Sequence, residues 1–181
     1  MAHIQLPENA PGIIGPMIAY PETERHLNGL AEALLRGASS LTPAEREAIA
    51  TYVSSGNECH FCTQAHAAAA RELYGSECGV VDQLLEDKST AHVDEKMRAL
   101  LAIADKVRQD GRLVTPEDVE RARAAGADDK AIHDTVLIAA AFCMFNRYVD
   151  GLATWAPKKP EAYKPIGEML ATRGYVNSIQ R

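Results

Sequence analysis

Residues 138–145, IAAAFCMF, form an apolar stretch in the middle of a segment without the alternation of a strand. Asp128 can cap a helix at one end, and Pro157 cannot continue it at the other, so one long helix from 129 to about 154 is predicted. A helix that is apolar on every side is normally buried on every side. The rest of the chain is therefore expected to wrap this helix. The longest apolar run, 136–145, is shorter than the roughly 20 residues that a bilayer crossing needs.

Apolar residues recur at the helical period in most of the remaining chain. The predicted helices cover 22–36, 79–85, 94–107 and 116–126. Two further helices are predicted between the first two of these: one begins at Thr42-Pro43 and continues past Val53, and the next starts at a cap at Ser55 or Asn57 and ends at Gly75. Two of them begin with similar capping patterns, Thr42-Pro43-Ala44-Glu45 and Thr115-Pro116-Glu117-Asp118, which suggests a duplicated helical hairpin. Because no segment alternates like a strand, we expect an all-α, single-domain helical bundle.

Three regions are expected along the chain. Residues 1–21 are broken by prolines between apolar residues, which predicts an extended N-terminal arm that docks on the protein or on a neighbouring subunit. Residues 22–156 should form the helical core domain, and residues 157–181 a C-terminal tail with one short helix. A chain of 181 residues can bury roughly 70% of its unfolded surface as one domain, so no second domain is required.

The charge pattern excludes some partners. The formal net charge is -6, and the Lys and Arg residues are scattered rather than clustered, which argues against a nucleic-acid or anionic membrane partner. The N-terminus has no positive charge before Arg25 and is interrupted by prolines, so it lacks the pattern of a signal peptide. A cytoplasmic location is therefore expected.

The segment from Glu47 to His66 contains the most chemically informative motif. Cys59, Cys62 and His66 are three and four residues apart, so on a helix they share one face. Helix caps at Asn57 or Ser55 would place both cysteines in the first turn, where free amide groups and the helix dipole favour a thiolate. In a reducing compartment such a pair is more often catalytic or metal-binding than a structural disulfide. Redox chemistry is the favoured interpretation.

A zinc site is the main alternative for the same residues. Cys59, Cys62 and His66 supply three ligands, and Cys78 could supply a fourth, which would make the protein a non-enzymatic helical zinc module. The chain has no second CxxC or HxxxH pattern to complete a typical structural site. The isolated Cys143, inside the apolar helix, is expected to act as a small hydrophobic residue.

Three polar residues follow the apolar stretch near the end of the predicted long helix. Asn146, Arg147 and Asp150 follow one another within about a turn of its buried part, so their side chains need partners. Pairing of Arg147 with Asp150, or with a glutamate on another helix, is the simpler expectation, and a place at the edge of a pocket is the other.

Several pieces of the chain together resemble the alkylhydroperoxidase D-like proteins of the carboxymuconolactone decarboxylase superfamily, in their peroxidase-related branch. They are Glu47 followed after eleven residues by Cys59-x-x-Cys62 and three residues later by His66, VTPEDVERARAAG at 114–126, and FNRYVDGLAT at 145–154. The resemblance implies a thiol peroxidase without a bound cofactor. It also implies a peroxide substrate, an external dithiol or thiol reductant, and association with further copies of the chain.

The resemblance assigns roles to four residues. Glu47 and His66, through a bound water, would deprotonate Cys62, and Cys59 would close a redox-active disulfide with it. Two features depart from related proteins: the alkylhydroperoxidase prototype has a histidine where this chain has Phe61, and the decarboxylase branch lacks the CxxC pair. A shorter proton relay is therefore expected, and lactone decarboxylation is disfavoured.

The relative position of the two thiols predicts their order of reaction. The helix dipole near Cys59 contributes about 0.3 to 1 kcal/mol, whereas an imidazole within hydrogen-bond reach of Cys62 acts as a base. Cys62 is therefore predicted to attack the peroxide, with a pKa below the usual value of about 8.5. Cys59 is predicted to resolve the intermediate and to lie near the helix mouth, where an outside dithiol can reach it.

Overall fold

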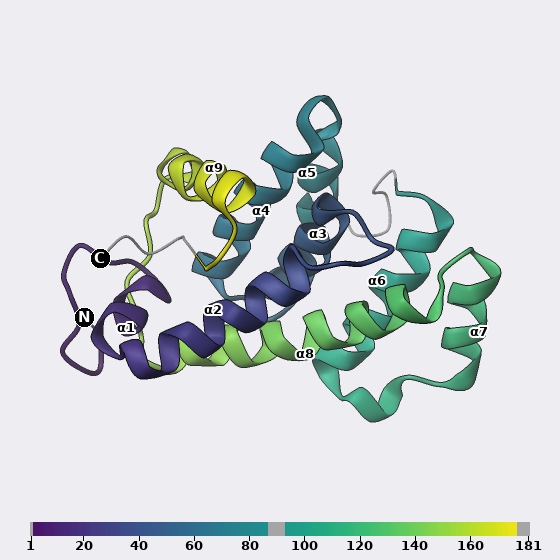
Figure 1. Cartoon of the computed structure of the whole chain (residues 1–181), viewed down its shortest axis with the longest axis horizontal. Helices are drawn as coiled ribbons and strands as arrows, with labels where there is room; N and C mark the ends of the chain where they lie inside the picture. The colour runs from purple at the N-terminus through teal and green to yellow at the C-terminus, as the bar shows by residue number, and fades with distance from the viewer. Residues whose placement is uncertain (1, 87–92, 177–181) are drawn as a thin grey trace.

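The computed structural model describes residues 2–86 and 93–176, and over these residues the chain is helical without any strand, which confirms the all-α prediction (Figure 1). The α-helices are α1 Ile14–Ala19, α2 Pro21–Leu35, α3 Pro43–Gly56, α4 His60–Tyr74, α5 Gly79–Glu86, α6 Glu95–Gln109, α7 Pro116–Ala124, α8 Asp129–Gly151 and α9 Lys164–Arg173. Short 3-10 turns occupy Gly75–Glu77, Gly111–Leu113 and Pro160–Tyr163. The last part of the predicted tail, 177–181, lies outside the described residues.

Local capping chemistry explains where two of these helices begin. At the start of α3 the hydroxyl of Thr42 accepts a hydrogen bond from the Glu45 amide, and the Glu45 carboxylate accepts one from the Thr42 amide at 2.7 Å. At the start of α7 the Asp118 carboxylate accepts from the Thr115 amide at 2.9 Å. Proline stands at the first helical position of both helices, where its missing N–H costs nothing. The two helices share the capping pattern but not their length, since α3 has 14 residues and α7 has 9. Duplication of a helical hairpin therefore stays a hypothesis.

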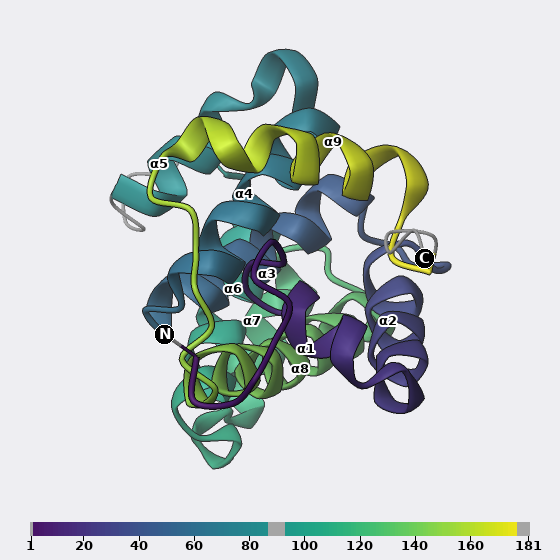
Figure 2. The same cartoon turned by 90° about the vertical axis from the view of Figure 1, so that its left-hand side faces the viewer.

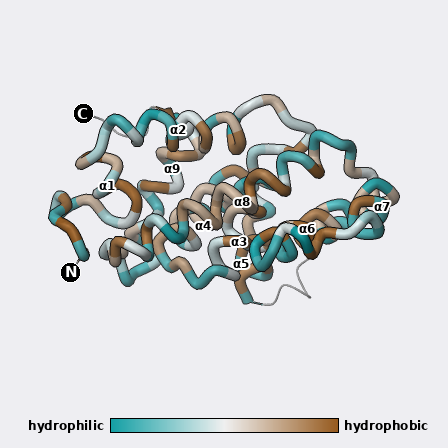
Figure 3. The backbone as a smooth tube through the Cα atoms, turned by 90° about the horizontal axis from the view of Figure 1, so that it is seen from below, coloured by the Kyte–Doolittle hydropathy of each residue, from teal (hydrophilic) through white to brown (hydrophobic). Residues whose placement is uncertain are grey.

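The core lies where α3, α4 and α8 meet. The helix α3 packs along α4 and against α8, while α6 covers α8 and α9 covers α4 from outside. Apolar stretches run through these central helices (Figure 3). Large side chains such as Ile49, Ile138 and Phe142 are almost completely buried, and each contributes about 1.5 to 3 kcal/mol by leaving water.

The long helix α8 is not buried on every side, which corrects the expectation from its apolar centre. Leu137 is 38% exposed, Met144 is 43% exposed, and Ala140 between them also faces solvent. The reason is that α2, α3 and α6 cover one side of α8 and leave a single row free. This apolar row agrees with association between copies of the chain, which stays a prediction. Among the described helices none is long and apolar enough to cross a membrane.

The N-terminal arm folds back onto its own chain. The arm contains α1, so the expected extended conformation is wrong over Ile14–Ala19. The amide of Gly12 donates to the carbonyl of Trp155 at 2.9 Å. A Cβ on Gly12 would lie 2.1 Å from the ring of Phe61, and its φ is +55°, so only glycine allows this close contact. The arm therefore docks on its own chain at these positions.

The C-terminal helix α9 lies across α4 (Figure 2). The contact is close because Gly167 faces Ala68: a Cβ on Gly167 would lie 2.6 Å from the Ala68 backbone. As a result both ends of the chain, α1 and α9, approach the same part of α4, which carries the cysteine motif.

Candidate functional site

The two cysteines lie at the start of α4. Glu58 adopts a left-handed conformation with φ of +59°, which turns the chain sharply after α3. Cys59 then occupies the N-cap position, and Cys62 lies in the first turn of the helix. This differs from the predicted caps, because Asn57 ends α3 instead of starting α4. The two thiols are free and are not joined in a disulfide.

The predicted exposure of Cys59 is wrong. Cys59 is 0% exposed and is packed with Phe61, Val149 and Tyr163. The segment after α8 completes this cover, because the hydroxyl of Tyr163 donates to the carbonyl of Pro157 at 2.9 Å. An outside dithiol can reach Cys59 only after this cover opens.

Glu47 and His66 are brought into contact inside the protein. Glu47 is 0% exposed, and its Oε2 lies 2.8 Å from His66 Nδ1. Its other oxygen, Oε1, accepts from Arg36 Nη2 at 2.7 Å and from the hydroxyl of Tyr175 at 2.5 Å. The predicted pair is thus part of a four-residue cluster, which we call the Glu47 cluster: Arg36, Glu47, His66 and Tyr175.

The Glu47 cluster keeps its carboxylate ionised. Burial alone would raise the pKa of Glu47, but the charge and hydrogen bond of His66, the charge of Arg36 and the hydrogen bond from Tyr175 outweigh it and lower the pKa. A carboxylate that already accepts from three side chains has little capacity to take up another proton. Glu47 is therefore suited to orient His66 and not to act as a base itself.

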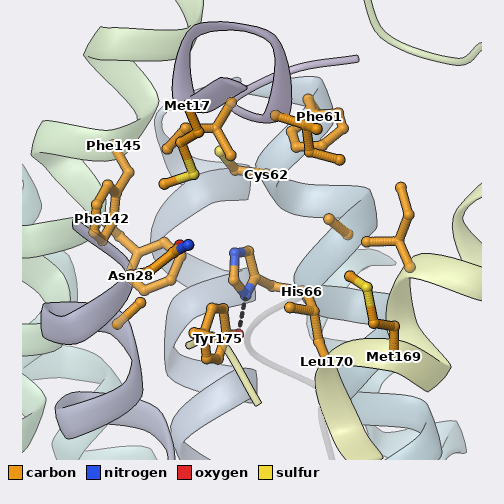
Figure 4. A pocket seen from close by; sticks show the side chains of 15 residues that line it. Met17, Asn28, Phe61, Cys62, His66, Phe142, Phe145, Met169, Leu170 and Tyr175 are labelled. Atoms are coloured by element: carbon orange, nitrogen blue, oxygen red, sulfur yellow. Dashed lines mark hydrogen bonds between the residues drawn. The ribbon is translucent and has the colours of Figure 1, made fainter. Parts of the chain in front are cut away.

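The hydrogen bond to Glu47 also fixes the proton on the His66 ring. Because an ionised carboxylate only accepts hydrogen bonds, Nδ1 carries a proton, and in the neutral ring Nε2 is the nitrogen with a free lone pair. Figure 4 shows the second ring nitrogen directed away from Tyr175 and into a cavity. The ring of Phe142 meets the imidazole edge-on, with centroids 4.6 Å apart, and limits its rotation.

An apolar cavity lies between α4, α8 and the two chain ends. Its volume is about 80 Å³, several times the roughly 15 Å³ that one water needs. Its polar wall consists of Cys62, His66, Asn28 and Tyr175 (Figure 4). Cys59 is not part of the wall. The apolar wall is formed by Ile13, Ile14, Met17, Ala31, Phe61, Ala65, Phe142, Phe145, Ile166, Met169 and Leu170.

The expectation of an acidic Cys62 thiol is wrong. Its hydrogen bond with Cys59, together with burial and the nearby negative charge of a Cys59 thiolate, raises the pKa of Cys62 well above its usual value. A hydrogen bond from Asn146 opposes this shift without reversing it. Among the contacts of the described residues no hydrogen bond joins Cys62 to His66, so the imidazole faces the cavity and does not touch the sulfur.

Asn146 is held in place by a short polar chain. Asn57 donates to its Oδ1 at 2.8 Å, so its amide nitrogen must point the other way, toward Ser54 Oγ at 3.1 Å and toward Cys62. The sequence singled out Asn146 as a residue that needs a partner but did not identify these. The expected pairing of Arg147 with Asp150 is not found in the described part of the chain, where Arg147 donates to the Cys143 carbonyl.

The zinc alternative does not fit the geometry. In residues 2–86 and 93–176, no three His, Cys, Asp or Glu side chains converge as metal ligands. Cys59 is enclosed by apolar side chains and does not line the cavity that His66 and Cys62 share. Cys78 follows the far end of α4 and is only partly buried. The residues that the zinc hypothesis combines are therefore not assembled into a site.

Arg36 and Tyr175 were not identified from the sequence. Tyr175 lies 128 residues after Glu47, and neither belongs to a motif with a characteristic spacing. The only local signal is Gly174, whose φ of +69° ends α9 and turns the chain inward.

Comparison with known proteins agrees with this arrangement. The profile of the Carboxymuconolactone decarboxylase family matches residues 21–106, which include Glu47, both cysteines of the CxxC pair and His66. A search of curated proteins gives no match.

Solved structures extend the similarity over most of the chain. An uncharacterized peroxidase-related protein from Silicibacter sp. TM1040 is 29% identical, with a TM-score of 0.74 over 83% of this chain and 78% of that one. An alkylhydroperoxidase AhpD core protein from Ralstonia eutropha JMP134, also called uncharacterized and peroxidase-related, is 27% identical. Its TM-score is 0.77 over 87% of this chain and 80% of that one. A protein of unknown function from Agrobacterium tumefaciens, provisionally described as the antioxidant defence protein AhpD, shares the fold at 21% identity, with a TM-score of 0.69 over 82% and 99%.

Proposed function

We propose that this chain, which is an alkylhydroperoxidase D-like member of the carboxymuconolactone decarboxylase superfamily, is a thiol peroxidase that reduces organic hydroperoxides. One observation carries the proposal. Cys62 and His66, with Nε2 directed inward, line the same apolar cavity, and Cys59 lies directly behind Cys62. A nucleophile, a base and a resolving thiol are thus placed within one small volume.

The proposed reaction begins with the hydroperoxide in the cavity. As the thiol of Cys62 loses its proton to His66 Nε2, the sulfur attacks the terminal peroxide oxygen and the O–O bond breaks. The leaving alkoxide takes the proton from His66 and departs as an alcohol. Because no hydrogen bond joins Cys62 to His66, the bound hydroperoxide or a water in the cavity must connect them. Cys62 is then a sulfenic acid.

Cys59 completes the cycle. Its thiol condenses with the Cys62 sulfenic acid, which forms the disulfide and releases water. An external dithiol, the proposed second substrate, attacks this disulfide and is itself oxidised to a disulfide. The Tyr163 and Pro157 cover over Cys59 must move at that stage, since it closes the sulfur off from solvent.

The walls of the cavity favour hydroperoxides with an apolar body. Apart from Asn28, Cys62, His66 and Tyr175, the wall consists of apolar side chains, several of them from the chain ends outside residues 21–106. We expect kcat/KM to be roughly tenfold or more higher for cumene hydroperoxide than for hydrogen peroxide, because burial of the apolar body strengthens binding. Peroxide consumption with a dithiol reductant measures both. No consumption of either peroxide with any of several dithiols and monothiols would contradict the proposed function.

Alkylation of Cys62 should depend on pH in a characteristic way. Its pKa is held well above the usual value, so the rate of alkylation by iodoacetamide is expected to keep rising as the pH passes 8.5. In the denatured chain the alkylation rate of the same thiol should have its midpoint near pH 8.5 and level off above it, which provides the control. Since the folded pKa is the higher one, the thiol favours folding below pH 8.5, and this stabilisation is lost as the pH rises further. A plateau of the folded-state rate below pH 8.5 would contradict the buried, protonated thiol.

A further inference from the structure

The C-terminal turn places one tyrosine at the centre of the Glu47 cluster. The amide of Tyr175 donates to Glu32 Oε2 at 2.6 Å, and Gly174 lies so close to the same carboxylate that a Cβ would be 2.4 Å from it. These contacts with α2 turn the chain inward after α9. The ring of Tyr175 is consequently buried, stacked on His66 at 6.1 Å between centroids and covered by the Arg36 guanidinium at 5.2 Å.

The hydroxyl of Tyr175 can only act as a donor toward Glu47. Burial and the charge of Glu47 raise the pKa of Tyr175 well above its usual value, so the phenol keeps its proton. It donates that proton to Oε1 at 2.5 Å, beside Arg36 Nη2 at 2.7 Å. With two donors on Oε1, only Oε2 remains for His66. The oxygen of the same hydroxyl lies 3.2 Å from Nδ1 and gives that N–H a second acceptor.

We propose that Tyr175 is a positioning residue of the peroxidase site: with Arg36 it clamps Glu47 Oε1, so that Oε2 holds His66 with Nε2 bare and directed at the cavity. This inference rests on the proposed function. It assigns Glu47 the role of a fixed anion, whereas the resemblance implied a glutamate that shares in removing the proton. The C-terminal segment then supplies part of the site and does not only cover it.

Other charged groups near Glu47 limit what the tyrosine alone controls. Arg36 follows α2, which also presents Glu32, and Arg46 lies beside Glu47 on α3. His66 comes from α4. In Tyr175→Phe all of these remain, and the ring still stacks on His66. The variant removes the hydrogen bond to Glu47 Oε1 and the second acceptor of the His66 Nδ1–H.

The test compares Tyr175→Phe with the unaltered protein. Loss of a hydrogen bond to a charged group should raise the pH at which Glu47 takes up its proton by about one unit. A carboxyl-labelled NMR titration of Glu47 reports this midpoint without any reference to activity. Tyr74→Phe, the same change on the far part of α4, serves as the control and should leave the midpoint unchanged.

Peroxide consumption provides the second measurement. In Tyr175→Phe the low-pH limb of the activity profile should shift to higher pH together with the Glu47 midpoint. The value of kcat should fall several-fold while KM changes little. If the midpoint and the profile both stay in place, the proposal is wrong although the peroxidase function stands. If the unaltered protein consumes no peroxide, the proposed function fails, and the titration still decides whether Tyr175 clamps Glu47.

Nitrogen-15 NMR of the His66 ring checks the geometry in the unaltered protein. The proposal requires the neutral ring to carry its proton on Nδ1, because both neighbouring oxygens accept from that atom. A neutral ring protonated on Nε2 would overturn it whatever the variants show.

Discussion

Cys62→Ser is expected to lower peroxide consumption by roughly 1,000-fold or more, since a serine hydroxyl cannot replace a thiolate as the nucleophile toward a peroxide oxygen. Cys62 is the cysteine that lines the cavity beside His66, and Cys59 lies outside it. Cys59→Ser should also stop multiple turnovers, but for a different reason. It should complete the first step and then stall as a sulfenic acid on Cys62, because no second thiol is present to condense with it.

Trapping of the intermediate distinguishes the two thiols. A dimedone-type reagent added during turnover should label Cys62 in Cys59→Ser and leave Cys62→Ser unlabelled, as read by mass spectrometry. Cys78→Ser, a change beyond the far end of α4 and outside the cavity wall, should keep full activity and serves as the control. An adduct on Cys59 in Cys62→Ser would reverse the assignment of the two roles while keeping the disulfide cycle.

Most of the helices could be predicted from the sequence because their signals are local. The spacing of apolar residues and the capping boxes at Thr42 and Thr115 act within a few residues, and the structure has α3 and α7 starting where these patterns place them. The contact between Glu47 and His66 also follows from short-range order, since α3 and α4 are joined by a tight turn and pack along each other. The resemblance identified the pair, and helix packing brings it together.

Features that depend on tertiary packing could not be predicted. The burial of Cys59 depends on Tyr163 and Val149, which reach it from distant parts of the chain, and the helical spacing of the motif contains no information about them. The direction of the Cys62 pKa shift has the same origin, because the motif indicates a nearby imidazole but not whether it touches the sulfur. The exposed row on α8 likewise depends on how many helices pack around it.

Arg36→Met is expected to lower the free energy of unfolding by about 3 to 5 kcal/mol at pH 7, the usual cost of removing one partner of a buried ion pair. The Arg36 side chain is 12% exposed and that of Glu47 is 0% exposed, so water cannot replace the lost cation. Arg36 also donates to the carbonyl of Leu170, which helps to anchor α9. Urea unfolding of the two proteins measures the difference.

The difference in unfolding free energy between Arg36→Met and the unaltered protein should shrink as the pH falls, because it depends on the charge of Glu47. In the unaltered protein the pKa of Glu47 is lowered, so the ionised carboxylate stabilises the fold above pH 4.5, and this stabilisation is lost as the pH falls further. In Arg36→Met the buried carboxylate of Glu47 lacks this cation, so its pKa rises. Protonation of Glu47 then removes the unpaired buried charge that destabilises the variant. The two unfolding free energies should therefore converge in acid. A difference independent of pH would assign the effect to lost packing and not to the charge of Glu47.

The double variant Arg36→Met with Glu47→Gln separates stability from catalysis. It removes both charges but keeps a side chain of the same shape that can still accept from Tyr175, so most of the lost stability should return. Arg112→Met serves as the control for stability. It breaks an exposed ion pair with Asp110 that water already screens, so it should leave the free energy of unfolding unchanged.

The activity of the double variant tests the role of Glu47. If Glu47 acts as the anion that holds His66, the double variant should fold well and still consume peroxide slowly, because a neutral amide stabilises the protonated imidazole far less than a carboxylate does. Full activity in the double variant would show that His66 works without an anion behind it, and that the Glu47 cluster serves the fold alone.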